Sequence, residues 1–241
     1  MKLNIFDTVD EVLAGLAAYF IKTANEAIAE HGHFSVALSG GSSPKKLYSL
    51  LASETYKDQL DWTKIYFFFG DERYVPDTNP ASNYQMAKKV LFEPLVINPE
   101  HIFAVNTLLS PQEAAEQYMH TISTFFKGND PRFDLVLLGL GDNSHTASLF
   151  PYTSVLHEVD ATVKPVFLTD QQVYRITFTA SLINKAHHIA FLVYGESKAM
   201  AIHNVLEEDV DTQNYPAQLI HPFNGVPPEW FVDKPAVKNL Q

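Results

Sequence analysis

The 241-residue chain contains no cysteine, and its positive charges are few. The absence of cysteine excludes disulfides, thiolate nucleophiles and cysteine-based metal sites. Lysine and arginine number 17 against 28 aspartates and glutamates, which gives a formal net charge of -11. Nucleic acids and anionic membranes require a basic surface, so neither is expected as a partner. An anionic small molecule would need a local basic pocket.

Long apolar runs are also missing, because none reaches the roughly 18 residues that a membrane span requires. The segment MKLNIFDTVDEV lacks the basic region and the apolar core of a secretory signal. We therefore expect a cytoplasmic protein with no membrane partner. No Gly/Ser-rich or Pro-rich linker and no internal repeat interrupts the chain, which predicts a single domain over residues 1–241.

The remaining pattern alternates short apolar runs with segments of helical periodicity. Capping-box patterns begin at Thr8 and Ser110, each ahead of a helical segment. The expected strands are 34–38, 64–69, 101–105, 133–140, 166–168, 175–179 and 189–194. The expected helices are 8–30, 44–51, 82–92, 111–126, 181–186 and 195–207. This alternation predicts a doubly wound α/β fold, with a mostly parallel sheet and helices on both faces.

The stretch 133–151, FDLVLLGLGDNSHTASLFP, passes from a buried strand directly into a polar turn. In open α/β sheets, ligands bind beyond the carboxyl ends of the strands, where this turn lies. Histidine titrates nearest neutrality, so His145 can accept a proton from water at a working pH. A lone histidine is more often structural. The position of His145 after a buried strand and a double-glycine turn nevertheless makes it the main catalytic candidate.

Residues 39–44, SGGSSP, form a glycine- and serine-rich turn between a predicted strand and a predicted helix. Free N–H groups at a helix N-terminus attract phosphate, although a simple capped turn is the alternative. The P-loop ending GK[ST] is missing. Arg175 and Lys198 are each compatible with an ordinary surface position. If the sheet brings them beside Ser42, the three groups form a basic pocket for a phosphorylated substrate.

The segment 70–73, GDER, places three charges at the end of another predicted strand. Charges in a surface turn are often simply solvated, and this is the favoured interpretation of the segment taken alone. The same position suits an active-site carboxylate, Asp71, and an anion-binding guanidinium, Arg73.

Two further patterns carry less weight. Gly139-x-Gly141-x-x-Ser144 lacks the third glycine of a dinucleotide fingerprint and does not follow the first strand of a βαβ unit. The pair His187 and His188 has no carboxylate at a recognisable metal-ligand spacing, which favours a structural role. These motifs therefore predict neither a nucleotide cofactor nor a metal ion.

Five motifs jointly resemble the 6-phosphogluconolactonase family, within the larger glucosamine-6-phosphate deaminase-like superfamily. They are LSGGSSPKKLY (38–48), FFGDERYVP with SNY (68–84), GLGDNSHTASLFP (139–151), RITFT with HIAFLVYGESKA (175–199) and PEWFVDKPA (228–236). They occur in the family's order and cover essentially the whole chain. The resemblance implies hydrolysis of 6-phosphoglucono-1,5-lactone to 6-phosphogluconate in the oxidative pentose phosphate pathway, without a metal or an organic cofactor.

Carried over by motif, the resemblance makes His145 the general base that activates the attacking water. The residues that it implies for the phosphate are Gly40, Gly41, Ser42, Arg175 and Lys198. Asp71 and Arg73 would line the sugar side. A δ-lactone is an activated ester, so positioning and one base suffice without a covalent nucleophile. The charge that develops on the carbonyl oxygen needs donors, either backbone N–H groups near residues 139–146 or Arg73.

One motif departs from the superfamily pattern G-x-G-x-D-G-H. Asn143 and Ser144 occupy its Asp and Gly positions, and Asp142 falls one place earlier. In the deaminases that aspartate is linked to opening of the sugar ring and to support of the histidine. Asn143 can hydrogen-bond but cannot carry the charge, which weakens the deaminase interpretation. An amino-sugar phosphate isomerase-deaminase and a non-catalytic sugar-phosphate sensor are the alternatives, and retention of His145, Asp71 and Arg73 argues against the sensor.

Overall fold

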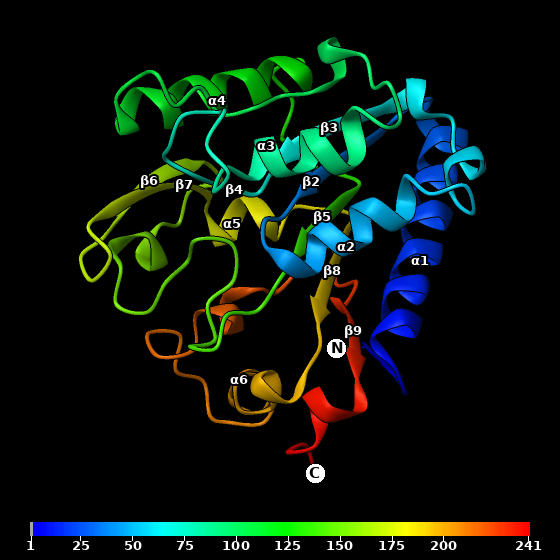
Figure 1. Ribbon diagram of the computed structural model, residues 1–241. Coiled ribbons are helices and arrows are strands. Elements are labelled where there is room, and N and C mark those ends of the chain that lie inside the picture. Colours follow the sequence, from blue (N-terminus) through cyan, green and yellow to red (C-terminus); the bar gives the residue numbers. More distant parts are fainter. Residues whose placement is uncertain (1) are drawn as a thin grey trace.

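The computed structural model describes residues 2–241 and has a six-stranded parallel sheet at its centre (Figure 1). The strands lie in the order β1-β9-β8-β5-β2-β3. Their bounds are β1 Lys2–Phe6, β2 Phe34–Leu38, β3 Ile65–Phe69, β5 Leu135–Leu138, β8 His188–Val193 and β9 Glu229–Asp233. All five neighbouring pairs are parallel. The predicted α/β fold with a mostly parallel sheet is confirmed.

Helices cover both faces of this sheet because its strands send apolar side chains alternately to the two sides. Val36 and Leu38 of β2 belong to the core that includes α1 (Val9–His31) and α2 (Ser42–Leu51). Ala37 belongs to the opposite core, which includes residues of three other helices. These helices are α4 Pro111–Phe125, α5 Ala180–Ile183 and α6 Ala199–Leu206. All four residues of β5 are buried, as the continuous apolar run predicted.

A second sheet of three antiparallel strands packs against α4 (Figure 1). Its order is β4-β7-β6, with β4 Asp71–Arg73, β7 Val173–Phe178 and β6 Val163–Leu168. The sequence predicted strands near β6 and β7 but not their separation from the main sheet, and it treated GDER as a turn. The segment extends into a strand because Gly70 O accepts a hydrogen bond from Phe178 N at 2.8 Å, which docks β4 on β7.

The helix ends follow the local rules. Thr8 and Ser110 are N-caps of complete capping boxes, in which Glu11 and Glu113 accept back from the cap backbone. The segment predicted as one helix over 82–92 is α3 (Asn83–Ala87) followed by a π-helical turn. Within residues 2–241, no helix is both long enough and apolar enough to cross a membrane.

At the edges of the main sheet one expectation fails and one strand was missed. The predicted strand 101–105 is wrong, because residues 99–101 form a 3-10 turn and only Ile102 makes an isolated bridge to Phe67. The amino-terminal strand β1 carries a weak apolar pattern and was not predicted. It pairs with β9, which places the first and last strands of the chain side by side.

Candidate active site

A cleft of about 260 Å³ opens at the carboxyl ends of the central strands. Residues 39–44, 139–141 and 192–194, at the ends of β2, β5 and β8, line it together with side chains from β4 and β7. Eight of the nine predicted site residues lie on this cleft: Gly40, Gly41, Ser42, Asp71, Arg73, His145, Arg175 and Lys198. The ninth, Asn143, is outside the lining but contacts His145.

A tight turn after β5 fixes the position of His145. Gly141 N donates to His145 O at 2.8 Å, and Ser144 N donates to Gly141 O at 3.0 Å. A β-carbon on Gly141 would lie 2.0 Å from the imidazole ring, so a larger residue would displace the ring. On its other side the ring stacks on Phe150, with centroids 3.9 Å apart and planes at 19°. The imidazole is therefore held between the turn backbone and an aromatic ring.

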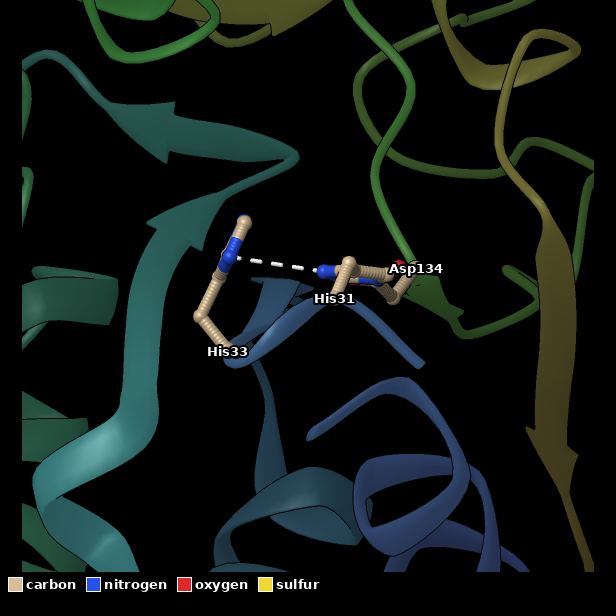
Figure 2. Close-up of side chains that lie close together, drawn as sticks. All are labelled: His31, His33 and Asp134. Carbon is tan, nitrogen blue, oxygen red and sulfur yellow. Dashed lines mark hydrogen bonds and ion pairs between the residues drawn. The ribbon is translucent and has the colours of Figure 1, made fainter. Parts of the chain in front are cut away.

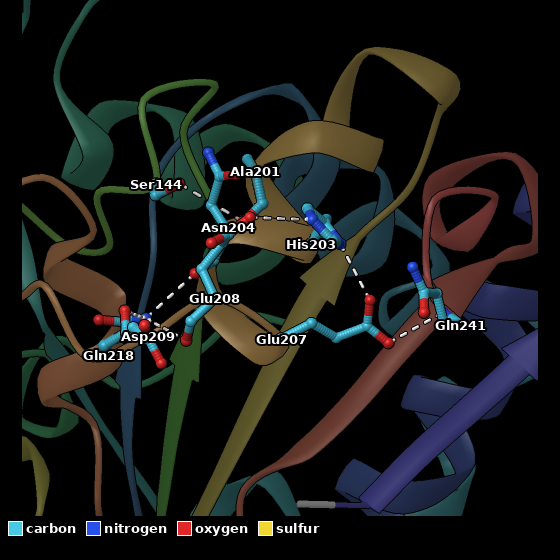
Figure 3. Close-up of polar contacts among 9 residues, drawn as sticks. All are labelled: Ser144, Ala201, His203, Asn204, Glu207, Glu208, Asp209, Gln218 and Gln241. Carbon is cyan, nitrogen blue, oxygen red and sulfur yellow. Dashed lines mark hydrogen bonds and ion pairs between the residues drawn. The ribbon is translucent and has the colours of Figure 1, made fainter.

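Ser144 keeps the backbone shape of this turn even though the superfamily pattern has glycine there. Its φ is 60°, in the left-handed region that costs a non-glycine residue about 1–2 kcal/mol. The fully buried side chain donates from Oγ to Ala201 O of α6 at 3.4 Å (Figure 3). Its carbonyl accepts from Ala217 N at 3.0 Å. These contacts hold the residue in place and oppose relaxation of the turn.

Asn143 contacts the catalytic candidate directly, since its Oδ1 lies 2.5 Å from His145 Nδ1. An amide oxygen can only accept, so the proton of this hydrogen bond resides on Nδ1. The other ring nitrogen, Nε2, then carries the lone pair that can take a proton from water. Asn143 thus sets the tautomer that a general base requires.

The surroundings of His145 lower its pKa from 6.5 to about 4. Burial is the main cause, and the positive charge of Lys198 is the next. Asp142 acts in the opposite direction, while Arg175 and Arg73 add to the lowering. The imidazole is therefore neutral at pH 7 and can accept a proton.

The amino end of α2 presents free N–H groups to the cleft. Its N-cap is Gly41, at φ 110°, which provides no side-chain cap and adopts a conformation that favours glycine. Pro44 at the third helical position has no N–H. The free first-turn donors are therefore those of Ser42 and Ser43, and the helix dipole adds a partial positive charge. This is the geometry that binds a phosphate group.

Cationic side chains complete this anion-binding region. Lys198 Nζ lies 2.6 Å from Asp142 Oδ1. The Asp142 side chain is 75% exposed, so the ion pair is weak enough for a bound phosphate to take its place. Arg73 and Arg175 face each other in the register of β4 and β7. One guanidinium N–H of Arg73, on Nη1, donates to Ala81 O at 2.7 Å. Three cations thus meet at one cleft of an acidic protein.

Asp71 lies on the same cleft and is nearly buried, with 8% of its surface exposed. Its Oδ2 accepts a hydrogen bond from Ser148 Oγ at 2.7 Å. The backbone N–H of Ser148 in turn donates to Thr177 Oγ1 at 3.2 Å. The turn that carries His145 is thereby tied to the second sheet. The hydroxyl of Ser148 fixes the orientation of the Asp71 carboxylate.

Sequence reasoning missed Glu72, which is 2% exposed. Its carboxylate accepts hydrogen bonds from Arg73 N, Asn83 N, Tyr84 N and Ser82 Oγ. Burial raises the pKa of Glu72, while the backbone donors favour its ionised form. The alternation of side chains along β4 could have identified it. Asp71 and Arg73 face the cleft, so Glu72 points the other way, to the start of α3.

Asn83 is a second missed residue, and it joins the helix-end cradle to β4. Its Nδ2 donates to Asp71 O at 2.8 Å. A β-carbon on Gly40 would lie 1.8 Å from Asn83 Oδ1, so the amide packs directly on the glycine backbone. Asn83 therefore sets the spacing between the N-terminus of α2 and the strand that carries Asp71 and Arg73.

Comparison with known proteins places this fold in a defined class. A family model described as glucosamine-6-phosphate isomerases/6-phosphogluconolactonase matches residues 7–227. The chain belongs to this family, as the five motifs indicated.

Several similar proteins are named 6-phosphogluconolactonases. The 6-phosphogluconolactonase of Synechocystis sp. is 42% identical over 220 residues, which cover 90% of this chain and 88% of that protein. The probable 6-phosphogluconolactonase 1 of Arabidopsis thaliana is 36% identical over 254 residues, covering 99% and 93%. Among solved structures, 6-phosphogluconolactonase from Trypanosoma cruzi has a TM-score of 0.89 at 28% identity, covering 100% of this chain and 97% of that one.

Proposed function

We propose that this protein hydrolyses 6-phosphoglucono-1,5-lactone to 6-phosphogluconate in the oxidative pentose phosphate pathway, with His145 as general base. Family membership and the lactonase relatives support the reaction. One observation carries the assignment of residues. A single cleft holds a neutral histidine beside an uncapped helix N-terminus and three cationic side chains.

The phosphate of the substrate binds at the amino end of α2. The free N–H groups of Ser42 and Ser43, next to Gly40 and Gly41, donate to its oxygens, while Lys198 and Arg175 supply opposite charge. Lys198 exchanges its partner Asp142 for the phosphate. The phosphate is bound equally in ground and transition states, so this region mainly determines KM.

His145 then takes a proton through Nε2 from a water molecule, and the water oxygen bonds to the lactone carbonyl carbon. The carbonyl π electrons move to its oxygen and form a tetrahedral oxyanion. When the carbonyl re-forms, the bond to the ring oxygen breaks. The protonated His145 returns its proton to that oxygen, which becomes a hydroxyl group. One water is added, and the open-chain acid is released.

We assign stabilisation of the oxyanion to Arg73. Two backbone N–H groups of the turn, those of Gly141 and Ser144, are already bonded to His145 O and Gly141 O. Arg73 uses Nη1 for Ala81 O and has further N–H donors on the same guanidinium. A preorganised donor at this point contributes to the rate because the negative charge develops only in the transition state.

The deaminase alternative is less well supported by this cleft. In the deaminases an aspartate at this position is linked to opening of the sugar ring, and Asn143 occupies the position here. The decisive experiment measures lactone hydrolysis and glucosamine-6-phosphate deamination on one preparation of the purified protein. We expect lactone hydrolysis well above the spontaneous rate near neutral pH and no deamination. Phosphosugar binding without acceleration of either reaction would instead identify a sensor.

The 241 residues are proposed to form one domain, and the pairing of β1 with β9 supports this because it joins the two ends of the chain in one sheet. Limited proteolysis should then give no stable fragment corresponding to part of the sheet. The cytoplasmic location stays a prediction from the sequence, to be tested by cell fractionation.

A further inference from the structure

Three side chains that can ligate a metal gather at the amino ends of β2 and β5 (Figure 2). The cleft lies at the opposite, carboxyl ends of these strands. His31 is the last residue of α1, His33 directly precedes β2, and Asp134 directly precedes β5. One ligand atom from each residue lies within 4.8 Å of the others. Because β2 and β5 are paired neighbours, the sheet itself brings His31 to a residue 103 positions away.

Gly32 turns the chain between the two histidines. It closes α1 in the left-handed conformation, at φ 90°, and its N–H donates to Ile28 O. The imidazoles of His31 and His33 consequently lie side by side, with ring centroids 4.6 Å apart and Nδ1 atoms 3.4 Å apart. The short sequence His-Gly-His thus directs two nitrogen ligands to one point.

Hydrogen bonds from Ser35 orient the carboxylate of Asp134. Asp134 is 5% exposed, and its Oδ2 accepts from Ser35 N and Ser35 Oγ, each at 2.8 Å. The other oxygen, Oδ1, is left for the histidines and lies 3.0 Å from His31 Nε2. Metal-binding carboxylates are commonly oriented by such hydrogen bonds to their second oxygen.

We propose that His31, His33 and Asp134 bind one divalent ion of the zinc class. Ligands about 2.0–2.2 Å from a tetrahedral zinc ion lie roughly 3.3 Å from one another. One ligand atom from each residue already lies within 4.8 Å of the others, so rotation of the side chains has to close only the remaining difference. Two imidazoles and one carboxylate suit Zn²⁺ or Co²⁺, whereas Mg²⁺ and Ca²⁺ prefer oxygen ligands alone. The His31 side chain is 36% exposed, so water can complete the coordination.

Without the ion, His31 bridges the other two residues by using both of its ring nitrogens. Metal binding replaces these two hydrogen bonds with one bond from each residue. The rearrangement falls on His31, the most exposed member of the cluster, while the buried Asp134 keeps its bonds to Ser35. A purely structural hydrogen-bond network is the competing explanation, and it predicts no response to zinc.

The bound ion would link the turn between α1 and β2 to the start of β5. It would act on stability, because the five residue-to-residue steps from Asp134 to Gly139 separate it from the cleft by roughly 16 Å of extended chain. A ligand that binds only the folded state raises its stability by mass action. Zinc at about one hundred times its Kd should raise the Tm by about 5–10 °C for a chain of this size.

The test uses the full-length protein stripped of metal by a chelator. Titration calorimetry with Zn²⁺ should give one site per chain, and the Tm should rise as above. His31→Gln and His33→Gln should each weaken zinc binding at least tenfold, and the double variant should abolish the Tm increase. Co²⁺ should produce the visible absorption of a tetrahedral complex in the wild type and not in the double variant.

Two controls separate this site from other histidines. His221→Gln changes an exposed histidine elsewhere on the surface and should leave zinc binding intact. His145→Gln tests whether zinc instead enters the catalytic cleft. Equal zinc affinity in the wild type and the His31/His33 double variant, or loss of binding in His145→Gln alone, would overturn the proposal. Lactone hydrolysis by the metal-free protein is measured separately, so the two proposals can fail independently.

Discussion

The Nδ1 atom of His145 lies 2.5 Å from the Oδ1 atom of Asn143. An asparagine here orients the imidazole and selects its tautomer but adds no negative charge. Burial, together with the incompletely balanced cations Lys198, Arg175 and Arg73, holds the pKa of His145 at about 4. As the proposed base, His145 is neutral at pH 7, but it is also weak.

Replacing Asn143 by aspartate tests this relationship. A carboxylate beside the Nδ1–H favours the protonated ring, so Asn143→Asp should raise the pKa of His145 by about 1–3 units. The stronger base should increase kcat at pH 8 by roughly two- to tenfold, while the acidic limb of the kcat profile moves to higher pH. Steady-state rates from pH 4 to 9 measure both effects. Asn143→Leu, which removes the hydrogen bond altogether, should lower kcat, and an unchanged kcat in it would disprove the orienting role.

His145→Gln removes the proposed base and should lower kcat by about 10²–10⁴-fold with little change in KM. The same substitution should increase the stability of the folded protein relative to the wild type as the pH falls. The folded-state pKa of about 4 lies below the ordinary 6.5, so the unfolded chain binds the proton first as the pH falls. The wild type therefore loses about 2 kcal/mol between pH 7 and pH 5 that the variant keeps. Thermal unfolding at both pH values should show a relative gain for His145→Gln at pH 5.

The sequence predicted most of this site because its residues follow strands that end at one edge of the sheet. His145 and Ser42 come directly after strong apolar runs, so the rule for parallel sheets was enough to bring them together. Arg175 was harder to place from sequence. It lies on an antiparallel strand of the second sheet, and only the pairing of β7 with the short β4 brings it opposite Arg73.

Glu72 and Asn83 escaped prediction for a different reason. Both act through backbone groups, and their partners are fixed by how the loop 74–82 folds back on β4. The alternation along β4 shows only that Glu72 points away from the cleft, and no periodic pattern encodes the loop that supplies its partners. The cluster of His31, His33 and Asp134 could not be predicted from the sequence either. Asp134 comes close to the histidines only because β2 pairs with β5.

Lys198→Met tests the electrostatic link between the phosphate region and the base. KM should rise by about tenfold or more because an ion pair with the phosphate is lost. The pKa of His145 should rise, because Lys198 is the leading charge that lowers it. The acidic limb of kcat/KM should then lie at higher pH than in the wild type. Ionisation of the substrate phosphate is common to both enzymes, so the difference between the profiles belongs to the protein.

Asp142→Asn provides the complementary test. The exposed carboxylate of Asp142 forms an ion pair with Lys198, with Oδ1 2.6 Å from Nζ, and would repel the incoming phosphate. Its removal should lower KM by about two- to fivefold and leave kcat within about twofold, the range expected for one exposed ion pair. A higher KM in this variant would mean that Asp142 positions Lys198 for the phosphate rather than competing with it.

Glu72→Gln tests the buried anchor behind Arg73. The two carboxylate oxygens accept four hydrogen bonds, and a glutamine amide can replace only one of these oxygens. Its NH₂ group would face donors, which should cost about 2–3 kcal/mol and lower the Tm by roughly 5–10 °C. Glu100→Gln, at an exposed position, should change the Tm by about 1 °C or less. Because the start of α3 and the backbone of Arg73 would lose their shared anchor, kcat should fall more than KM rises. A variant with the expected Tm loss but unchanged kcat would show that Glu72 stabilises the fold without positioning Arg73.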